Sequence, residues 1–166
     1  LKKLIEDGIG AGRTDVELAA DLDLGAVTLE IPKGCRLVLD LKGHKLTSAA
    51  SPAIEMLGDL TILDSTVTTG PALSGTTVNY SSGLLRASAG HGIYVQPGCT
   101  FTLLSGTVRA AGKGIIVYAD RNEDGSYFQT AAQIDSGYVE AGDSALSVLG
   151  DGGKADINGG VLLSRN

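Results

Sequence analysis

The sequence predicts an all-β protein, a single-stranded right-handed parallel β-helix (solenoid) of about six or seven coils with a short N-terminal capping helix. Three observations predict it: a phased repeat of about 23 residues, 24 glycines among 166 residues, and only seven aromatic side chains in a chain that is 43% hydrophobic. Glycine allows tight corners, while Val, Ile, Leu and Ala fill a narrow interior. Residues 1–166 are therefore interpreted as one domain.

The first predicted element is a capping helix over residues 1–8. Leu1, Leu4 and Ile5 follow helical spacing, and Gly8 is a residue that can end a helix. Such a cap covers the open strand edges of the first coil. That coil is expected to comprise Val16–Ala20 and Val27–Ile31.

The following coils are predicted from a recurring first strand that opens with Gly and closes with Asp or Asn. Successive starts are separated by 24, 17, 23, 31 and 23 residues. The first-strand stretches are Gly34–Asp40, Gly58–Asp64, Gly75–Ser81, Gly98–Leu104, Gln129–Asp135 and Gly152–Asn158. Three short strands per unit are typical of one coil of a solenoid, since a coil cannot bury its apolar face alone.

A second and a third short strand follow in most units. The unit at Gly58 is the exception, because its third strand is weak or missing. The second strands are Lys45–Thr47, Leu84–Leu85, Thr107–Arg109, Tyr138–Glu140 and Val161–Leu162, and the third are Ala53–Met56, Gly92–Val95, Gly114–Val117 and Ala145–Val148. A β-sandwich is the alternative, but the phased recurrence favours the solenoid.

Parts of the chain resemble a known group of repeats. The stretches Asp15–Leu24, Leu29–Gly34 and Leu37–Thr47 resemble pectate-lyase-like right-handed parallel β-helix repeat proteins of Firmicutes surfaces and their phages, with Lys42 where that group has Asn. Leu104–Val108 and Ile157–Val161 resemble its later coils. The resemblance implies an extracellular location on a bacterial cell or virion surface, as a non-catalytic adhesin, fibre or decoration module.

Three functions stay open on this basis. The first is surface display for host or glycan attachment, with a glycan or protein partner. The second is a carbohydrate-binding module, and the third is a polysaccharide lyase or glycoside hydrolase. Arg36, Arg86 and Arg109 are assigned to different columns, which disfavours an enzyme that needs a base beside acids on one face. The strands at the C-terminal end have no predicted cap, so a homotrimer or an anchoring domain beyond either terminus is expected to cover them.

Charge and hydropathy limit the partners. The net charge is −6, from 13 basic and 19 acidic residues, and there is no basic stripe, so no nucleic-acid partner is expected. No apolar run reaches the roughly 18 residues of a membrane span. No cofactor is implied, with calcium as the exception considered below.

The most regular polar feature is a ladder of Asx residues at the ends of the first strands. It comprises Asp40, Asp64, Asp135 and Asn158. The structural interpretation is a row of Asx turns, in which side chains accept hydrogen bonds from backbone N–H groups two residues on. The functional alternative is a carboxylate row, in which Asp40 and Asp64 lie one coil apart and repulsion favours a cation or a raised pKa.

The 31-residue step predicts a protruding insertion, residues 119–128. Asp120, Asn122 and Asp124 precede Gly125 in the pattern of half a calcium loop, although Ala131 stands where the bidentate Glu belongs. A calcium site and a plain hairpin are both open here. Tyr118, Tyr127 and Phe128 flank the insertion and are the predicted ligand or partner contacts.

The cysteines and histidines carry no predicted catalytic chemistry. Cys35 and Cys99 are placed in one column three coils apart, roughly 14 Å at the usual strand spacing, so both are expected to be free thiols. His44 and His91 lack metal-ligand spacing.

Overall fold

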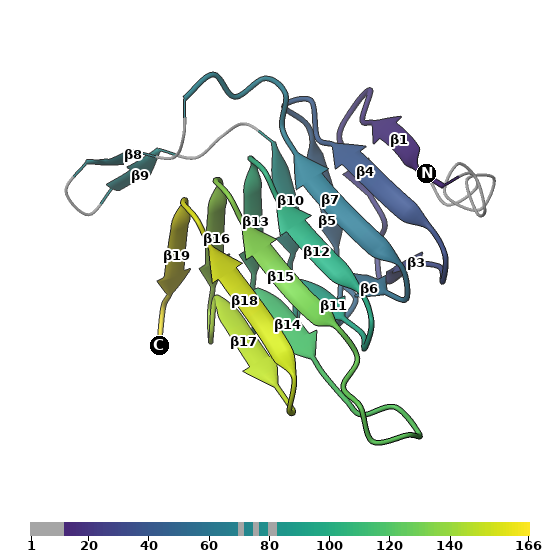
Figure 1. Cartoon of the computed structure of the whole chain (residues 1–166). Helices are drawn as coiled ribbons and strands as arrows, with labels where there is room; N and C mark the ends of the chain where they lie inside the picture. The colour runs from purple at the N-terminus through teal and green to yellow at the C-terminus, as the bar shows by residue number, and fades with distance from the viewer. Residues whose placement is uncertain (1–11, 70–71, 75–76, 80–82) are drawn as a thin grey trace.

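The computed structural model describes residues 12–69, 72–74, 77–79 and 83–166. The described residues form strands and turns without a helix. The capping helix predicted for residues 1–8 lies outside the described residues. Three parallel sheets run the length of the molecule, and one antiparallel hairpin projects from it (Figure 1).

Each parallel sheet collects one strand from each coil. The first sheet contains, in spatial order, β1 (Thr14–Glu17), β4 (Arg36–Asp40), β7 (Asp59–Leu63), β12 (Thr100–Leu103), β15 (Thr130–Ile134) and β18 (Gly153–Ile157). The second contains β2 (Leu22–Asp23), β5 (Lys45–Ser48), β10 (Leu84–Ala87), β13 (Thr107–Ala110), β16 (Tyr138–Ala141) and β19 (Val161–Ser164). The third contains β3 (Leu29–Ile31), β6 (Ile54–Met56), β11 (Ile93–Val95), β14 (Ile115–Tyr118) and β17 (Leu146–Leu149).

This order fits a parallel β-helix and counts its coils. Five coils contribute a strand to each sheet, and a sixth contributes β18 and β19. The count agrees with the lower end of the predicted six or seven. Right-handed winding follows from the usual handedness of parallel crossovers and stays a prediction.

The unit predicted to begin at Gly75 is wrong as a coil. The described parts of that stretch form a hairpin in which β8 (Ala72–Ser74) pairs antiparallel with β9 (Thr77–Asn79). The third coil instead runs from β7 to β10 and β11, with the hairpin inserted between its first two strands. Leu60 therefore pairs with Phe101, a step of 41 residues. The sequence predicts a weak or missing third strand for the unit at Gly58. In the structure, the third strand of this coil is β11, which follows the inserted hairpin.

The step from β4 to β7 also differs from the predicted 24 residues. Leu37 pairs with Leu60 and Leu39 with Ile62, which is a step of 23. A step of 24 would place Leu37 beside Thr61 and turn inward-facing side chains outward, because side chains alternate along a strand. The burial of the apolar interior, and not the position of Gly58, sets the register.

The core fills the space between the three sheets. Leu37, Leu60 and Phe101 lie side by side on the inner face of the first sheet, each at most 1% exposed. Phe101 pairs on its other side with the small Ala132, which leaves room for the ring. Phe101 is therefore an aromatic side chain that the narrow interior accommodates beside a small alanine, and Tyr138, at 1% exposed, is another fully buried aromatic side chain.

The two ends of the stack differ in exposure. Val16 and Leu18 in the first coil are buried, each 7% exposed. At the other end Val148 and Ile157, in columns whose other members face the core, are 41% and 54% exposed. The last strands thus present apolar side chains that earlier coils bury.

The turn between β4 and β5 is tight and left-handed. Lys42 and Gly43 have φ angles of 49° and 78°, and the N–H of His44 donates to the carbonyl of Leu41 at 2.7 Å. Two consecutive positive φ values are typical of a type I′ turn, which favours Asn or Gly. Lys42 is the one residue other than glycine with a positive φ among the described residues.

Candidate functional site

The Asx ladder is not a single column. In the observed register Asp40 pairs with Leu63, so Asp64 lies one position further along its strand. Ile134 pairs with Leu103 on one side and with Ile157 on the other. Asp135, the next residue, is therefore level with Leu104 and with Asn158, and these three positions form one column. The two carboxylates predicted to repel each other across one coil are therefore offset, and both are buried.

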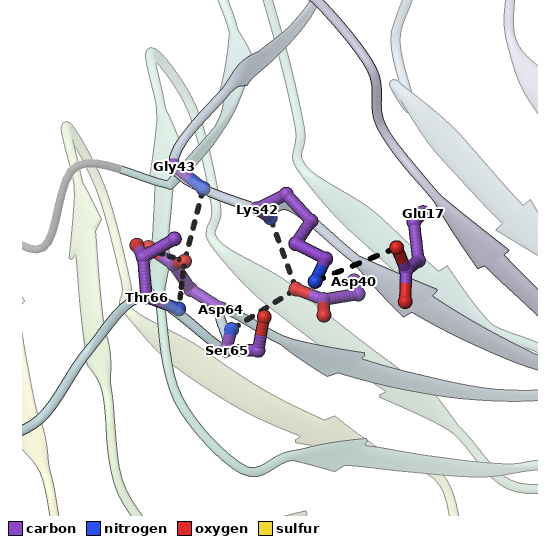
Figure 2. Close-up of polar contacts among 7 residues, drawn as sticks. All are labelled: Glu17, Asp40, Lys42, Gly43, Asp64, Ser65 and Thr66. Carbon is purple, nitrogen blue, oxygen red and sulfur yellow. Dashed lines mark hydrogen bonds and ion pairs between the residues drawn. The ribbon is translucent and has the colours of Figure 1, made fainter.

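Asp64 is the most heavily hydrogen-bonded of these residues. Its Oδ1 accepts from the N–H of Gly43 at 3.0 Å and from the N–H and hydroxyl of Thr66 at 3.1 and 2.6 Å. Its Oδ2 accepts from the N–H of Gly83 at 2.7 Å. Figure 2 shows the contacts with Gly43 and Thr66. Because Thr66 lies just before the hairpin insertion and Gly83 just after it, Asp64 fastens both ends of the insertion to the stack.

Asp40 makes a smaller set of contacts of the same kind. Its Oδ1 accepts from the N–H of Lys42 at 2.9 Å and from the N–H of Ser65 at 3.0 Å, as Figure 2 shows. The Lys42 ammonium lies 3.5 Å from Glu17 in the coil before. Asp40 therefore links its own turn to the next turn along the stack.

The pKa of each buried carboxyl follows from these contacts. Burial acts to raise the pKa of Asp64, but the hydrogen bonds from Thr66, Gly83 and Gly43 outweigh it and hold the pKa below its usual value. For Asp40, burial is likewise outweighed by hydrogen bonds from Ser65 and Lys42. The raised pKa expected from paired carboxylates is therefore not what this arrangement gives.

At the C-terminal end of the ladder, the hydrogen bonds join side chains to each other and not to the backbone. The Asn158 amide donates to Asp135 at 2.7 Å, and the Gln133 amide donates to both oxygens of Asp135 at 2.8 Å. These bonds hold the pKa of Asp135 below its usual value. Asp40 and Asp64 accept from the N–H two residues on, as the structural interpretation of the ladder predicts, whereas Asp135 and Asn158 are held by side-chain hydrogen bonds.

The insertion after β14 is a short, internally bonded protrusion. Arg121 and Tyr127 form an antiparallel bridge, and the N–H of Asn122 donates to the carbonyl of Ser126 at 2.7 Å. The Arg121 guanidinium lies 4.7 Å from the centre of the Tyr127 ring and donates to its hydroxyl at 2.6 Å. Gly125 closes the turn at a φ of 82°.

The three predicted calcium ligands are engaged within this protrusion. Asp120 accepts from the N–H of Arg121 at 2.7 Å, and Asp124 accepts from the N–H and hydroxyl of Ser126 at 2.9 and 2.6 Å. The Asn122 amide donates to the Ser126 hydroxyl at 2.9 Å. These are the contacts of a hairpin, and the calcium site stays a prediction.

The three predicted contact aromatics lie in different surroundings. Tyr118 stacks on Tyr94, with ring centres 6.1 Å apart, and is 36% exposed. Tyr127 is 38% exposed and packs over Gly152, where a Cβ would come within 2.7 Å of it. Phe128 is half-buried beside Gly98. Tyr118 therefore lies on β14, and Tyr127 and Phe128, at the end of the protrusion, pack over glycines of two different corner turns.

Phe128 lines a groove across three consecutive corner turns between the third and first sheets. The groove has a volume of about 740 Å³. The residues that line it are Lys33, Gly34, Cys35, Arg36, Leu57, Gly58, Asp59, Gln96, Pro97, Gly98, Cys99 and Phe128. It thus combines one aromatic side chain with charged and amide groups, a composition suited to a polar ligand.

The arginines correct another expectation. Arg86 and Arg109 pair directly across β10 and β13, so they share one column. The sequence analysis places them in different columns. Arg36 lies in the first sheet. The equal spacing of Leu84–Leu85 and Thr107–Val108 from these arginines was the signal in the sequence that could have joined them.

The cysteines and histidines are buried in the coil stack or make contacts between its coils. Cys35 and Cys99 are free and buried, and they precede β4 and β12, which are two strands apart and not three. Burial raises the pKa of Cys99 to about 11, which keeps its thiol protonated. His44 Nδ1 lies 3.5 Å from Asp21, and His91 Nδ1 accepts from the N–H of Lys113 at 3.0 Å.

Within the described residues, no three His, Cys, Asp or Glu side chains gather as a metal-binding group. In that same part of the chain, no helix is long and apolar enough to cross a membrane. No family model, curated protein or solved structure matches the chain.

Proposed function

We propose that the chain is a non-catalytic recognition module of a bacterial cell or virion surface, in which a stiff coil stack presents the protrusion 119–128 and the corner groove. The observation that carries this proposal is the preorganised protrusion. Its backbone is closed by the bonds of Asn122, Ser126 and Phe128, and it carries an exposed Tyr127 that packs over Gly152 and the groove-lining Phe128 that packs over Gly98. A contact surface ordered before binding loses less entropy when a partner docks.

A carbohydrate-binding module is the second candidate, and the corner groove favours it. Sugar rings stack on aromatic faces, and their hydroxyl groups bond to charged and amide side chains. Phe128 provides such a face at one part of the groove, and Lys33, Arg36, Asp59 and Gln96 provide the polar groups. The Arg36 guanidinium lies 3.6 Å from Asp59, so these two side chains are already oriented toward each other.

The experiment is a glycan array probed with the whole chain and with single variants. Phe128→Ala is expected to weaken binding to any retained glycan about tenfold or more, since it removes the aromatic face that lines the groove. Tyr127→Ala is expected to weaken it as well, because the ring leaves the protrusion. Val27→Ala, at an exposed apolar residue of the first coil, is the matched control and is expected to bind as the wild type does.

Equal binding by Phe128→Ala, Tyr127→Ala and the wild type would contradict this assignment. Release of unsaturated uronates from pectin or alginate by the wild-type chain would support the enzyme alternative in its place.

A further inference from the structure

A second surface, on the outer face of the second sheet, collects three arginines around one buried carboxylate. Arg86, Arg109 and Glu140 occupy one column on β10, β13 and β16, so they face outward from three consecutive coils. Arg165 follows β19 in the next coil. This Arg–Glu cleft is separate from the corner groove, which lies between the other two sheets.

Glu140 holds two of the arginines in place. Its side chain is 4% exposed, and its Oε1 accepts from Arg165 Nε at 2.6 Å and lies 3.4 Å from Arg109 Nη2. A buried carboxylate that contacts two guanidinium groups fixes their direction, since each fork has a planar, preferred geometry. Arg109 and Arg165 are about half exposed, so their outer N–H groups stay accessible.

Arg86 is the third arginine and has no such carboxylate. Its pairing neighbours in the sheet are Thr47 and Arg109. Among the described residues it makes no ion pair. Like charges that are directly opposite on neighbouring strands repel, so this position is unfavourable unless an anion lies between them.

The floor of the cleft is made of small residues. The cavity has a volume of about 370 Å³ and is lined, apart from the four charged side chains, by Ala87, Ser88, Ala110, Ala111 and Gly142. A Cβ on Gly142 would lie 2.1 Å from the carbonyl oxygen of Ala111, so glycine is required there by the approach of the two coils. The volume is in the range of small-ligand sites, which begins at about 300 Å³.

The charges of the lining identify the ligand chemistry. Three arginines and one glutamate leave two positive charges in the cleft, on a chain whose net charge is −6. We propose that the Arg–Glu cleft binds an oxyanion, a carboxylate or sulfate group, between Arg86 and Arg109, with Glu140 orienting Arg109 and Arg165. Guanidinium forks bind such groups through paired, charge-assisted hydrogen bonds.

The test is an NMR titration of the whole chain with sodium sulfate and with sodium acetate, against sodium chloride at equal ionic strength. Saturable shifts are expected at the amide N–H groups of Ala87, Ala110 and Gly142. Arg86→Gln is expected to weaken binding about tenfold or more, because it removes charge-assisted hydrogen bonds to the anion. Arg13→Gln, which changes an exposed arginine just before β1 that belongs to neither site, is the matched control and is expected to bind as the wild type does.

Further measurements distinguish an oxyanion carried by a sugar from a free small anion, and they check that Arg86→Gln is folded. Glucuronate or a sulfated monosaccharide binding more tightly than acetate or sulfate, with glucose not binding, would assign the group to a sugar ligand; equal binding would assign a free small anion. Without added anion, Arg86→Gln is expected to unfold at or slightly above the wild-type temperature, because the change removes the repulsion between Arg86 and Arg109. Shifts that do not saturate, or equal affinity in Arg86→Gln and the wild type, would overturn the proposal. Phe128→Ala is expected to keep this binding, so this site and the corner groove are tested independently.

Discussion

Replacing Asp64 with alanine is expected to lower the free energy of unfolding by about 3–5 kcal/mol, since each buried donor left without an acceptor costs about 1–3 kcal/mol. Asp64 is 1% exposed and is the acceptor for the N–H groups of Gly43, Thr66 and Gly83. Alanine leaves these donors without that acceptor. Urea unfolding followed by circular dichroism measures the change.

Two variants frame this result. Asp64→Asn keeps one acceptor oxygen but turns an amide toward donors, so an intermediate loss is expected. Asp143→Asn, at an exposed residue that lies 3.6 Å from Lys113, is the matched control and is expected to change the free energy of unfolding by less than about 0.5 kcal/mol. Similar losses in Asp64→Ala and Asp143→Asn would show that Asp64 does not hold the turns together.

Asp64 is also expected to make the stability of the folded protein decrease at low pH. Because the folded pKa of Asp64 is lowered, its ionised form stabilises the fold above the unfolded pKa, and this contribution is lost as the pH falls through the folded value. Asp40 acts in the same direction. Wild-type stability is therefore expected to fall below about pH 4, and Asp64→Asn is expected to show a shallower fall over that range.

Replacing Phe101 with alanine is expected to lower the free energy of unfolding by about 3–5 kcal/mol, the usual range for a buried phenylalanine. The ring is fully buried between Leu60 and Ala132 on the inner face of the first sheet. Because Ala132 is small and the sheets are hydrogen-bonded along their length, the coils have little freedom to close the cavity. Thermal and urea unfolding of the purified variant measure the loss.

Phe101→Leu is the control, since it keeps most of the buried apolar volume. A loss of about 1–1.5 kcal/mol is expected for that change. A larger loss for leucine than for alanine would mean that the ring does not fill the space between Leu60 and Ala132.

How much of the fold the sequence predicts depends on which signal sets the register. Alternating apolar residues predict the first-strand stretches at Gly34, Gly58, Gly98, Gln129 and Gly152, and all five contain strands of the first sheet. Aligning these stretches by their glycine and aspartate residues predicts a register for β7 that is wrong by one residue. The same alignment predicts a coil where the structure has the β8–β9 hairpin. Gly58 and Gly75 are local turn signals, whereas burial of Leu37 beside Leu60 is a property of neighbouring coils together.

The candidate sites show the same limit. The stretch 119–128 lies between β14 and β15, and the sequence points to it because an insertion changes the repeat length and is visible in one sequence. The pairing of Arg86 with Arg109, and their approach to Glu140, depends on the register of three coils. Two of the four contacts to Asp64 come from Thr66, two residues on, as expected of an Asx turn. The contacts from Gly43 and Gly83 join residues 21 and 19 positions away, so no local motif predicts them.

The most direct measurement is a disulfide-trapping experiment across the inserted hairpin. Thr61 and Thr102 are paired neighbours on β7 and β12, at a strand spacing of about 4.8 Å that allows a disulfide. Val38 and Thr102 are separated by two strand spacings, about 9.6 Å, which exceeds disulfide reach.

Peptide mass spectrometry after oxidation is predicted to find the cross-link in Thr61→Cys/Thr102→Cys and not in the matched pair Val38→Cys/Thr102→Cys. Failure of the 61–102 cross-link in a folded variant, or formation of the 38–102 cross-link, would contradict a third coil that runs from β7 to β10 and β11 around an inserted hairpin.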